Sequence, residues 1–163
     1  MLPDPERWLP PPPNIHWGPS RLHLWSFGLD QAVVLTAKLE SLLSASEREM
    51  AHRLRVERDR LRYVVAHGRL RQILSRYTNT APEQLSFGHG PYGKPYLSDG
   101  QGDSVHFNLS RSREIGLCAV AYGQEVGVDV EWMQPLDAMT TLVNRFFSLK
   151  ERADWNQLEE SQK

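Results

Sequence analysis

Residues 105–132 read VHFNLSRSREIGLCAVAYGQEVGVDVEW, three short apolar runs separated by turn-forming residues. This pattern predicts strands over 105–109, 115–122 and 126–132. Gly123-Gln124, between the last two runs, has the composition of a tight hairpin turn. We therefore expect those two strands to be antiparallel neighbours in one sheet.

The residues that precede this stretch alternate between strand and helix signals. Residues 21–27 have the alternation of a strand, and Asp30 is a candidate cap for the helix that follows. A Ser-x-x-Glu capping box opens a long helical region over 44–77, with a bend expected near Gly68. A further short strand is expected over 85–87. The chain is thus expected to combine helices with a mostly antiparallel sheet.

The two ends of the chain differ from each other. Residues 1–20 are rich in proline and are expected to form an extended N-terminal arm. Residues 137–147, and again the residues from Ser148 onward, have helical spacing. No closing strand is expected before Lys163.

Composition places the chain among globular proteins. Of its 163 residues, 40% are hydrophobic and 24% are charged. No apolar run reaches about 18 residues, and the proline-rich start lacks the order of a secretory signal, so we expect a cytoplasmic protein without a membrane partner. Cys118 is the single cysteine, which excludes an internal disulfide, and its apolar neighbours predict a buried core thiol.

Charge is divided unevenly along the chain. Residues 1–124 carry 15 Lys and Arg against 12 Asp and Glu, whereas residues 125–163 carry 4 against 8. Basic groups that could hold phosphate therefore precede acidic groups that could hold a metal, although ordinary surface charge is an alternative. Nine arginines over 48–76 also raise the hypothesis of nucleic-acid binding. Interspersed acidic residues and a pI near 6.6 count against it, and no nucleic-acid partner is expected.

Asp129 and Glu131 are the candidate metal ligands. They stand two residues apart in the strand predicted over 126–132, so their carboxylates share one face. Two hard oxygen ligands suit Mg²⁺, or Mn²⁺, bound together with water and substrate phosphate. The alternative is the solvent-facing side of an edge strand. The valines that flank both carboxylates favour a buried strand whose polar face has a function.

Two further segments offer donors for an anion. Residues 90–97, GPYGKPYL, form a Gly- and Pro-rich turn that presents Lys94 and backbone amides to a phosphate or an adenine edge. Ser110 and Arg111, at the end of the strand over 105–109, supply hydroxyl and guanidinium donors suited to phosphate. A plain hairpin connection and a polar strand end are the respective alternatives.

The order of these motifs resembles the surfactin-type family of 4′-phosphopantetheinyl transferases over roughly residues 21–163. The shared order is a capping box with an Arg-rich helix, Gly-Lys-Pro, Phe-Asn-Leu-Ser, Val-Gly-Val-Asp-Val-Glu, and Arg-Phe-Phe-Ser with a Glu three residues on. In this chain the motifs occupy residues 44–76, 93–95, 107–110, 126–131 and 145–151.

The resemblance implies an α+β fold that is a pseudo-dimer of two similar halves, with coenzyme A in the cleft between them. Residues 21–123 would form the N-terminal, coenzyme A-binding half. Residues 124–163 would begin the C-terminal half with the metal-binding strand and its helices. Because 39 residues are too few to equal the first half, the second half is expected to be incomplete.

The resemblance also implies site residues. Asp129 and Glu131 would coordinate Mg²⁺ on the coenzyme A pyrophosphate, and Lys94, Ser110 and Arg53 would contact the nucleotide and its phosphates. The arm of coenzyme A would pass to a serine of an acyl, peptidyl or aryl carrier protein, releasing adenosine 3′,5′-bisphosphate, without a covalent enzyme intermediate.

Arg111 stands where the family usually has His, and we expect it to bind phosphate as a cation that stays charged. The resemblance further implies a Trp-x-x-Lys-Glu-Ala motif that supplies the last metal ligand or catalytic base. Lys150-Glu151 matches an earlier segment, so this Glu is expected beyond Lys163 and no catalytic residue is assigned in this chain. The alternative function is an inactive fragment or degenerate paralogue that at most binds coenzyme A or a carrier protein.

Overall fold

The computed structural model describes residues 14–98, 100, 104–133 and 139–158. The chain divides into two compact units, residues 1–132 and residues 133–163. In chain order the elements are β1 (Leu22–Gly28), α1 (Val33–Glu40), α2 (Ala45–Arg53), α3 (Glu57–Thr78), the 3₁₀ turn η2 (Pro82–Gln84), β2 (Phe87–His89), β3 (Pro95–Leu97), β4 (Val105–Ser112), β5 (Ile115–Tyr122), α4 (Met139–Phe146) and α5 (Leu149–Gln157).

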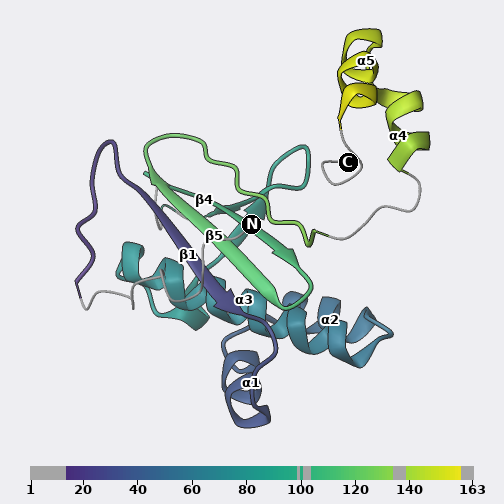
Figure 1. Ribbon diagram of the computed structural model, residues 1–163. Helices are drawn as coiled ribbons and strands as arrows, with labels where there is room; N and C mark the ends of the chain where they lie inside the picture. Colours follow the sequence, from purple (N-terminus) through teal and green to yellow (C-terminus); the bar gives the residue numbers. More distant parts are fainter. Residues whose placement is uncertain (1–13, 99, 101–103, 134–138, 159–163) are drawn as a thin grey trace. The chain divides into compact units, whose positions relative to one another are not determined.

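The first unit is built on a three-stranded antiparallel sheet of order β1-β5-β4, with helices on one face (Figure 1). Trp25 of β1 and Leu109 of β4 both stand opposite Cys118 of β5. The separate hairpin of β2 and β3 is also antiparallel. The expected combination of helices with antiparallel strands is confirmed, while the pseudo-dimer and the predicted halves stay predictions.

The core lies between α3 and the sheet. Leu70 and Leu74 of α3 pack with Phe107 of β4 and with Cys118 and Val120 of β5. Cys118, Val120 and Leu74 are fully buried, and burial of such apolar side chains drives the sheet onto the helix. The face of β1 away from α3 keeps apolar groups at the surface: Leu22 is 60% exposed and Leu24 is 47% exposed.

The long helical region predicted over 44–77 divides into α2 and α3. Leu54, at the end of α2, and Val56, before α3, have extended backbone, so the break falls there and not near Gly68. The first turn of α3 carries Glu57 and Asp59, which favour a helix start because their charges oppose the positive end of the helix dipole. The expected bend near Gly68 is wrong, because Gly68 lies inside continuous α3.

Gly68 instead lets α1 approach α3. A Cβ at this position would lie 2.7 Å from the Cβ of Leu39 and 2.9 Å from its carbonyl oxygen. The expected cap at Asp30 is also wrong, since Ala32 is the N-cap residue of α1. The carboxylate of Asp30 accepts two hydrogen bonds of 2.7 Å from Arg62 of α3.

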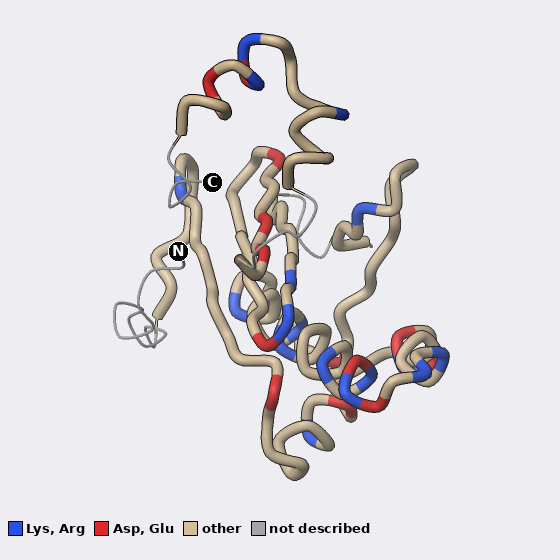
Figure 2. Tube along the Cα trace, turned by 45° about the vertical axis from the view of Figure 1, so that its right-hand side comes forward, with Lys and Arg blue, Asp and Glu red and all other residues tan. Residues whose placement is uncertain are grey.

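The helical layer carries charges of both signs. Figure 2 shows Lys and Arg interleaved with Asp and Glu along this part of the trace. Within the proline-rich arm, residues 1–13 lie outside the described residues. Trp17 packs its ring against Tyr77 of α3, with the ring centroids 4.5 Å apart.

The second unit contains α4 and α5. The helix predicted over 137–147 is confirmed from Met139 to Phe146, while residues 137 and 138 lie outside the described residues. The hydroxyl of Ser148 and the carboxylate of Glu151 form a capping box at the start of α5. Among the described helices of the whole chain, none combines the length and the apolar character needed to cross a membrane.

Candidate functional site

Residues 126–132, which we call the carboxylate segment, run beside β4 without forming a strand. Their backbone amides bond to polar side chains on the face of β4 away from α3, so no backbone ladder forms. We call these side chains the polar row, at alternate positions of β4. The three bonds run from Val128 to Asn108 Oδ1 (2.8 Å), from Val130 to Ser110 Oγ (3.2 Å) and from Trp132 to Ser112 Oγ (3.0 Å).

This arrangement corrects the strand predicted over 126–132. The segment was expected as a strand beside β5, but the hydrogen-bonded neighbours of β5 are β1 and β4. The three bonds join 128 to 108, 130 to 110 and 132 to 112, so the segment runs parallel to β4. Side-chain oxygens satisfy its amides where a sheet would use carbonyls.

The two serines of the polar row also bond to the carboxylates of the segment, one serine to each carboxylate. Ser110 Oγ donates to Asp129 Oδ1 across 2.7 Å, and Ser112 Oγ donates to Glu131 Oε2 across 3.2 Å. Both carboxylates belong to exposed residues. They are therefore held by neighbouring residues of the polar row, as two hard oxygen ligands open to solvent.

The donor set fits part of a Mg²⁺ site. Mg²⁺ commonly takes one or two carboxylates and completes its shell with water and phosphate oxygens. Within the described residues, no group of three or more His, Cys, Asp or Glu side chains is placed to hold a metal ion. Asp129 and Glu131 could hold the cation, and other oxygens would have to complete its shell.

Lys94, from the turn between β2 and β3, contacts the first residue of the carboxylate segment. Its ammonium forms an ion pair with Glu125 and donates to the carbonyl oxygen of Val126 across 2.9 Å. The turn that presents it contains Gly93 with φ of +78°, a backbone conformation suited to glycine. The loop thus places Lys94 against Val126, three residues before Asp129 in the chain.

Glu125 links Lys94 to His106, the first residue of β4 on the same face as the polar row. His106 Nδ1 lies 3.2 Å from Glu125 Oε1. The hydrogen bond from Lys94, with a smaller contribution from His106, holds the pKa of Glu125 below its ordinary value. Glu125 is therefore an anion, and it is paired with the Lys94 ammonium that was expected to bind phosphate.

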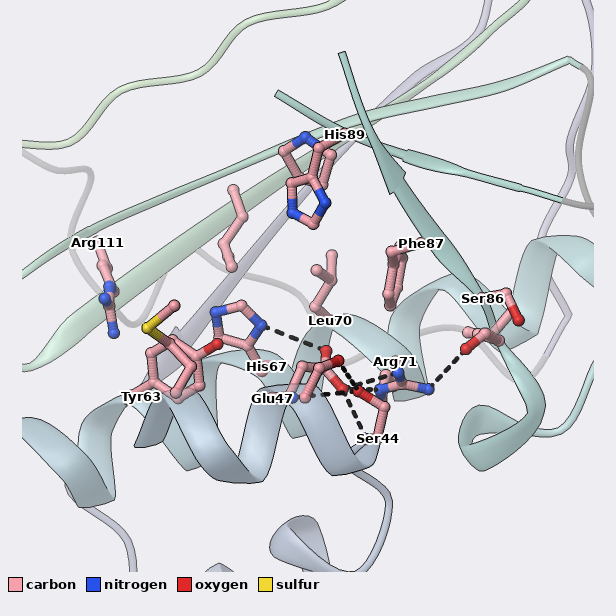
Figure 3. A pocket seen from close by; sticks show the side chains of 15 residues that line it. Ser44, Glu47, Tyr63, His67, Leu70, Arg71, Ser86, Phe87, His89 and Arg111 are labelled. Carbon is pink, nitrogen blue, oxygen red and sulfur yellow. Dashed lines mark hydrogen bonds and ion pairs between the residues drawn. The ribbon is translucent and has the colours of Figure 1, made fainter. Parts of the chain in front are cut away.

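Arg111 faces the other side of β4, where a cavity of about 550 Å³ opens between the helices and the β2-β3 hairpin (Figure 3). Its guanidinium carbon lies 5.3 Å from the ring centroid of Tyr63, which stacks on His67 at 4.0 Å. His89, from the end of β2, also lines this cavity. The lining therefore combines a permanent cation, two imidazoles and an aromatic face, a composition suited to a planar anionic ligand.

The floor of the cavity is a buried ion pair between α2 and α3. Arg71, only 1% exposed, has its Nη2 atom 2.7 Å from Glu47 Oε2. Burial alone would raise the pKa of Glu47, but bonds from His67, Arg71 and the amide of Ser44 lower it to about 2. Arg71 Nη1 also donates to the carbonyl oxygens of Pro82 (2.8 Å) and Leu85 (2.9 Å). This pair therefore braces the cavity.

The predicted site residues fall in different places. Ser110 of β4 bonds to Asp129, Glu131 bonds to the neighbouring Ser112, and Lys94 contacts the start of the carboxylate segment. Arg111 lies in the cavity. Arg53 pairs with Glu49 one helical turn earlier on α2, with 65% of its side chain exposed, and does not line this cavity.

Sequence reasoning missed several residues of this region. Glu125 and His106 are joined by tertiary contacts that no motif marks. Ser112 was visible as a polar residue two positions after Ser110, so the period of two along β4 could have indicated its role. Glu47 was identified only as a helix cap, although it also binds Arg71.

Comparison with known proteins gives a consistent result. The chain is 36% identical over 157 residues to the 4′-phosphopantetheinyl transferase HetI of Nostoc sp., covering 96% of this chain and 66% of the relative. It is 31% identical over 117 residues to a 4′-phosphopantetheinyl transferase of Bacillus subtilis, covering 72% and 50%. With AcpT of Salmonella typhi, a transferase of the same name, it shares 37% over 84 residues, covering 52% and 41%.

No protein-family model matches the chain. The chain spans somewhat less than two thirds of HetI and half of the Bacillus subtilis relative. The chain is thus homologous to part of several proteins that are all named 4′-phosphopantetheinyl transferases.

Proposed function

We propose that this chain, a homologue of 4′-phosphopantetheinyl transferases whose relatives support its place in that enzyme family, is part of a surfactin-type member. The proposed reaction moves the 4′-phosphopantetheine arm of coenzyme A onto a serine of an acyl, peptidyl or aryl carrier protein. Adenosine 3′,5′-bisphosphate is the other product. One observation carries the proposal beyond the relatives' names: the carboxylates of Asp129 and Glu131 are held by alternate serines of β4, and Lys94 contacts the start of the segment that carries them.

Asp129 and Glu131 are the proposed ligands of Mg²⁺, for which Mn²⁺ can substitute. The cation would neutralise the pyrophosphate of coenzyme A, on which charge develops as the arm departs. Ser110 holds Asp129 in place, and Lys94 would exchange Glu125 for a phosphate oxygen. These residues bind and orient the pyrophosphate, in line with phosphoryl transfer that relies on positioning and charge neutralisation.

Arg111 and the cavity beside it are the proposed nucleotide side of the site. A volume of about 550 Å³ lies within the range of small-molecule pockets. The guanidinium of Arg111 can bind a phosphate with two donors, and the Tyr63 ring offers a flat surface for a base. The proposed role of Arg53 is a phosphate contact made from the exposed end of α2, which requires it to leave Glu49.

The remaining carboxylate implied by the family resemblance is proposed to lie in the part of the relatives that this chain does not span. The same holds for the rest of a second half that would complete a pseudo-dimer. The exposed Leu22 and Leu24 side chains support a packing partner on that face of the sheet. The alternative, an inactive fragment or degenerate paralogue, is supported by one observation: among the described residues no group of three or more His, Cys, Asp or Glu side chains is placed to hold a metal ion.

The test is labelling of apo carrier domains with a fluorescent coenzyme A analogue and Mg²⁺. We compare the 163-residue chain with a version extended through a Trp-x-x-Lys-Glu-Ala segment taken from a relative. The extended protein is expected to label at least one acyl, peptidyl or aryl carrier domain, and EDTA is expected to abolish labelling.

Substitution of both carboxylates, D129N with E131Q, should reduce labelling by the extended protein by at least about a hundredfold. D154N, which removes one exposed carboxylate on α5, should leave it intact. Failure of the extended protein to label any carrier domain would overturn the proposal. Turnover by the 163-residue chain itself would refute the inactive alternative.

A further inference from the structure

Ser110 and Ser112 repeat one hydrogen-bonding pattern along the polar row. Each hydroxyl donates a hydrogen bond to one carboxylate of the carboxylate segment. Its oxygen accepts a hydrogen bond from the backbone amide of the residue that follows that carboxylate in the chain. Ser110 joins Asp129 (2.7 Å) to the Val130 amide (3.2 Å). Ser112 joins Glu131 (3.2 Å) to the Trp132 amide (3.0 Å).

The pattern fixes the direction in which each serine hydroxyl points its proton. A hydroxyl has one proton, and here that proton points at the carboxylate because the backbone amide already donates to the oxygen. The amide and the carboxylate that meet at Ser112 belong to consecutive residues, Trp132 and Glu131. One oxygen therefore fixes both the backbone position of the segment and the direction of the glutamate side chain.

Glu131 needs this restraint more than Asp129. An exposed glutamate samples many rotamers and loses that freedom when it binds a cation, whereas aspartate has one fewer rotatable bond. A hydrogen bond to one carboxylate oxygen leaves the other free to ligate. Partners of this kind, which orient metal-binding side chains without touching the metal, strongly affect metal affinity.

We infer that Ser112 is a positioning residue that holds the Glu131 carboxylate in its metal-binding orientation. The inference rests on the proposed function, because it assigns Glu131 to the same cation. Ser112 does not touch the cation; it acts through Glu131. A purely structural alternative exists, in which Ser112 only fastens the Trp132 amide to β4.

The test measures Mn²⁺ binding to the 163-residue chain from the electron paramagnetic resonance signal of the free ion. S112A is expected to weaken Mn²⁺ binding roughly tenfold. S112T, which keeps the hydroxyl, should bind like the unmodified chain. The matched control is S41A, which removes a serine hydroxyl that bonds to the Lys38 carbonyl on α1.

Thermal unfolding separates the two roles of Ser112. If S112A loses Mn²⁺ affinity while its unfolding midpoint stays near that of S41A, the positioning role stands. Equal Mn²⁺ binding by S112A and the unmodified chain would overturn the inference and leave the proposed metal site intact. No Mn²⁺ binding by the unmodified chain would overturn both the inference and the metal ligands assigned to this chain. Should S112A fail to fold, loss of affinity in a folded S112V variant tests the same step, and retained affinity refutes it.

Discussion

The guanidinium of Arg71 donates from Nε to Oε2 of Glu47 across 2.9 Å, although Arg71 is almost completely buried. Removing one partner of a buried ion pair leaves the other charge without compensation. We expect R71M to lower the free energy of unfolding by about 3 kcal/mol or more. Urea unfolding followed by circular dichroism measures this, with the exposed R55M as control. An unchanged R71M midpoint would contradict the bracing role of the pair.

The same pair predicts a pH dependence of stability. The pKa of Glu47 is lowered from 4.5 to about 2 in the folded protein, so its ionised form stabilises the fold. This contribution is complete above about pH 4.5 and is lost as the pH falls toward 2. E47Q lacks it at every pH. The unfolding free energies of E47Q and the unmodified chain should therefore differ at pH 7 and converge near pH 2. A difference that stays constant with pH would show that Glu47 is not the group responsible.

Gly68 is expected to tolerate no side chain. Because a Cβ there would meet Leu39 at 2.7 Å, G68A should force α1 away from α3 and destabilise the chain by about 1–3 kcal/mol. G18A is the control, since a Cβ at Gly18 would meet nothing within 4 Å. Thermal unfolding of the two variants checks the prediction. Equal midpoints would mean that α1 can shift without cost.

Lys94 should bind coenzyme A in competition with Glu125. K94A is expected to weaken coenzyme A binding to the chain roughly tenfold, because an ion-paired phosphate contact is lost. E125Q removes the competing anion, so it should strengthen binding roughly two- to fivefold at low salt, with less effect at high salt. Titration calorimetry at two ionic strengths measures both. Weaker binding by E125Q would instead mean that Glu125 holds Lys94 in its binding position.

Cys118 is expected to be unreactive in the folded protein. Burial raises the pKa of its thiol to about 12, and none of its surface is exposed. Because the thiolate is the reactive form, Ellman's reagent at pH 8 should modify Cys118 only as the sheet opens. The reaction is expected to be slow in buffer and fast in denaturing urea. Rapid modification of folded protein would mean that β5 is accessible.

Local signals in the sequence were sufficient for much of the fold. The capping box of Ser44 and Glu47 is confirmed, because both of its hydrogen bonds form at the start of α2. The strands predicted over 21–27, 105–109 and 115–122 correspond to β1, β4 and β5. These elements depend on caps, on alternation and on short apolar runs, which the sequence displays directly.

The features that were predicted wrongly depend on contacts between residues that are distant in the sequence. Asp30 has the chemistry of a cap, but Arg62, distant in sequence, takes both its oxygens. Gly68 has the composition of a bend, but its missing Cβ serves the contact with Leu39. The carboxylate segment has the valines of a strand, yet the polar row of β4 supplies its hydrogen bonds.

The same limit applies to the candidate site. Asp129 and Glu131 were identified from their spacing and Ser110 from its hydroxyl at a strand end, and in the structure Ser110 bonds to Asp129 while Glu131 bonds to Ser112. The neutralisation of Lys94 by Glu125 could not be predicted, because it depends on where a loop meets the end of β5.

The attachment of the carboxylate segment through side chains has a consequence for how such a site can change over generations. A backbone ladder forms its hydrogen bonds through N–H and C=O groups that nearly every residue carries, so a change of one side chain removes none of them. Here the register resides in three replaceable side chains, so a single codon change in β4 can retune the carboxylates while the sheet behind them keeps its pairing.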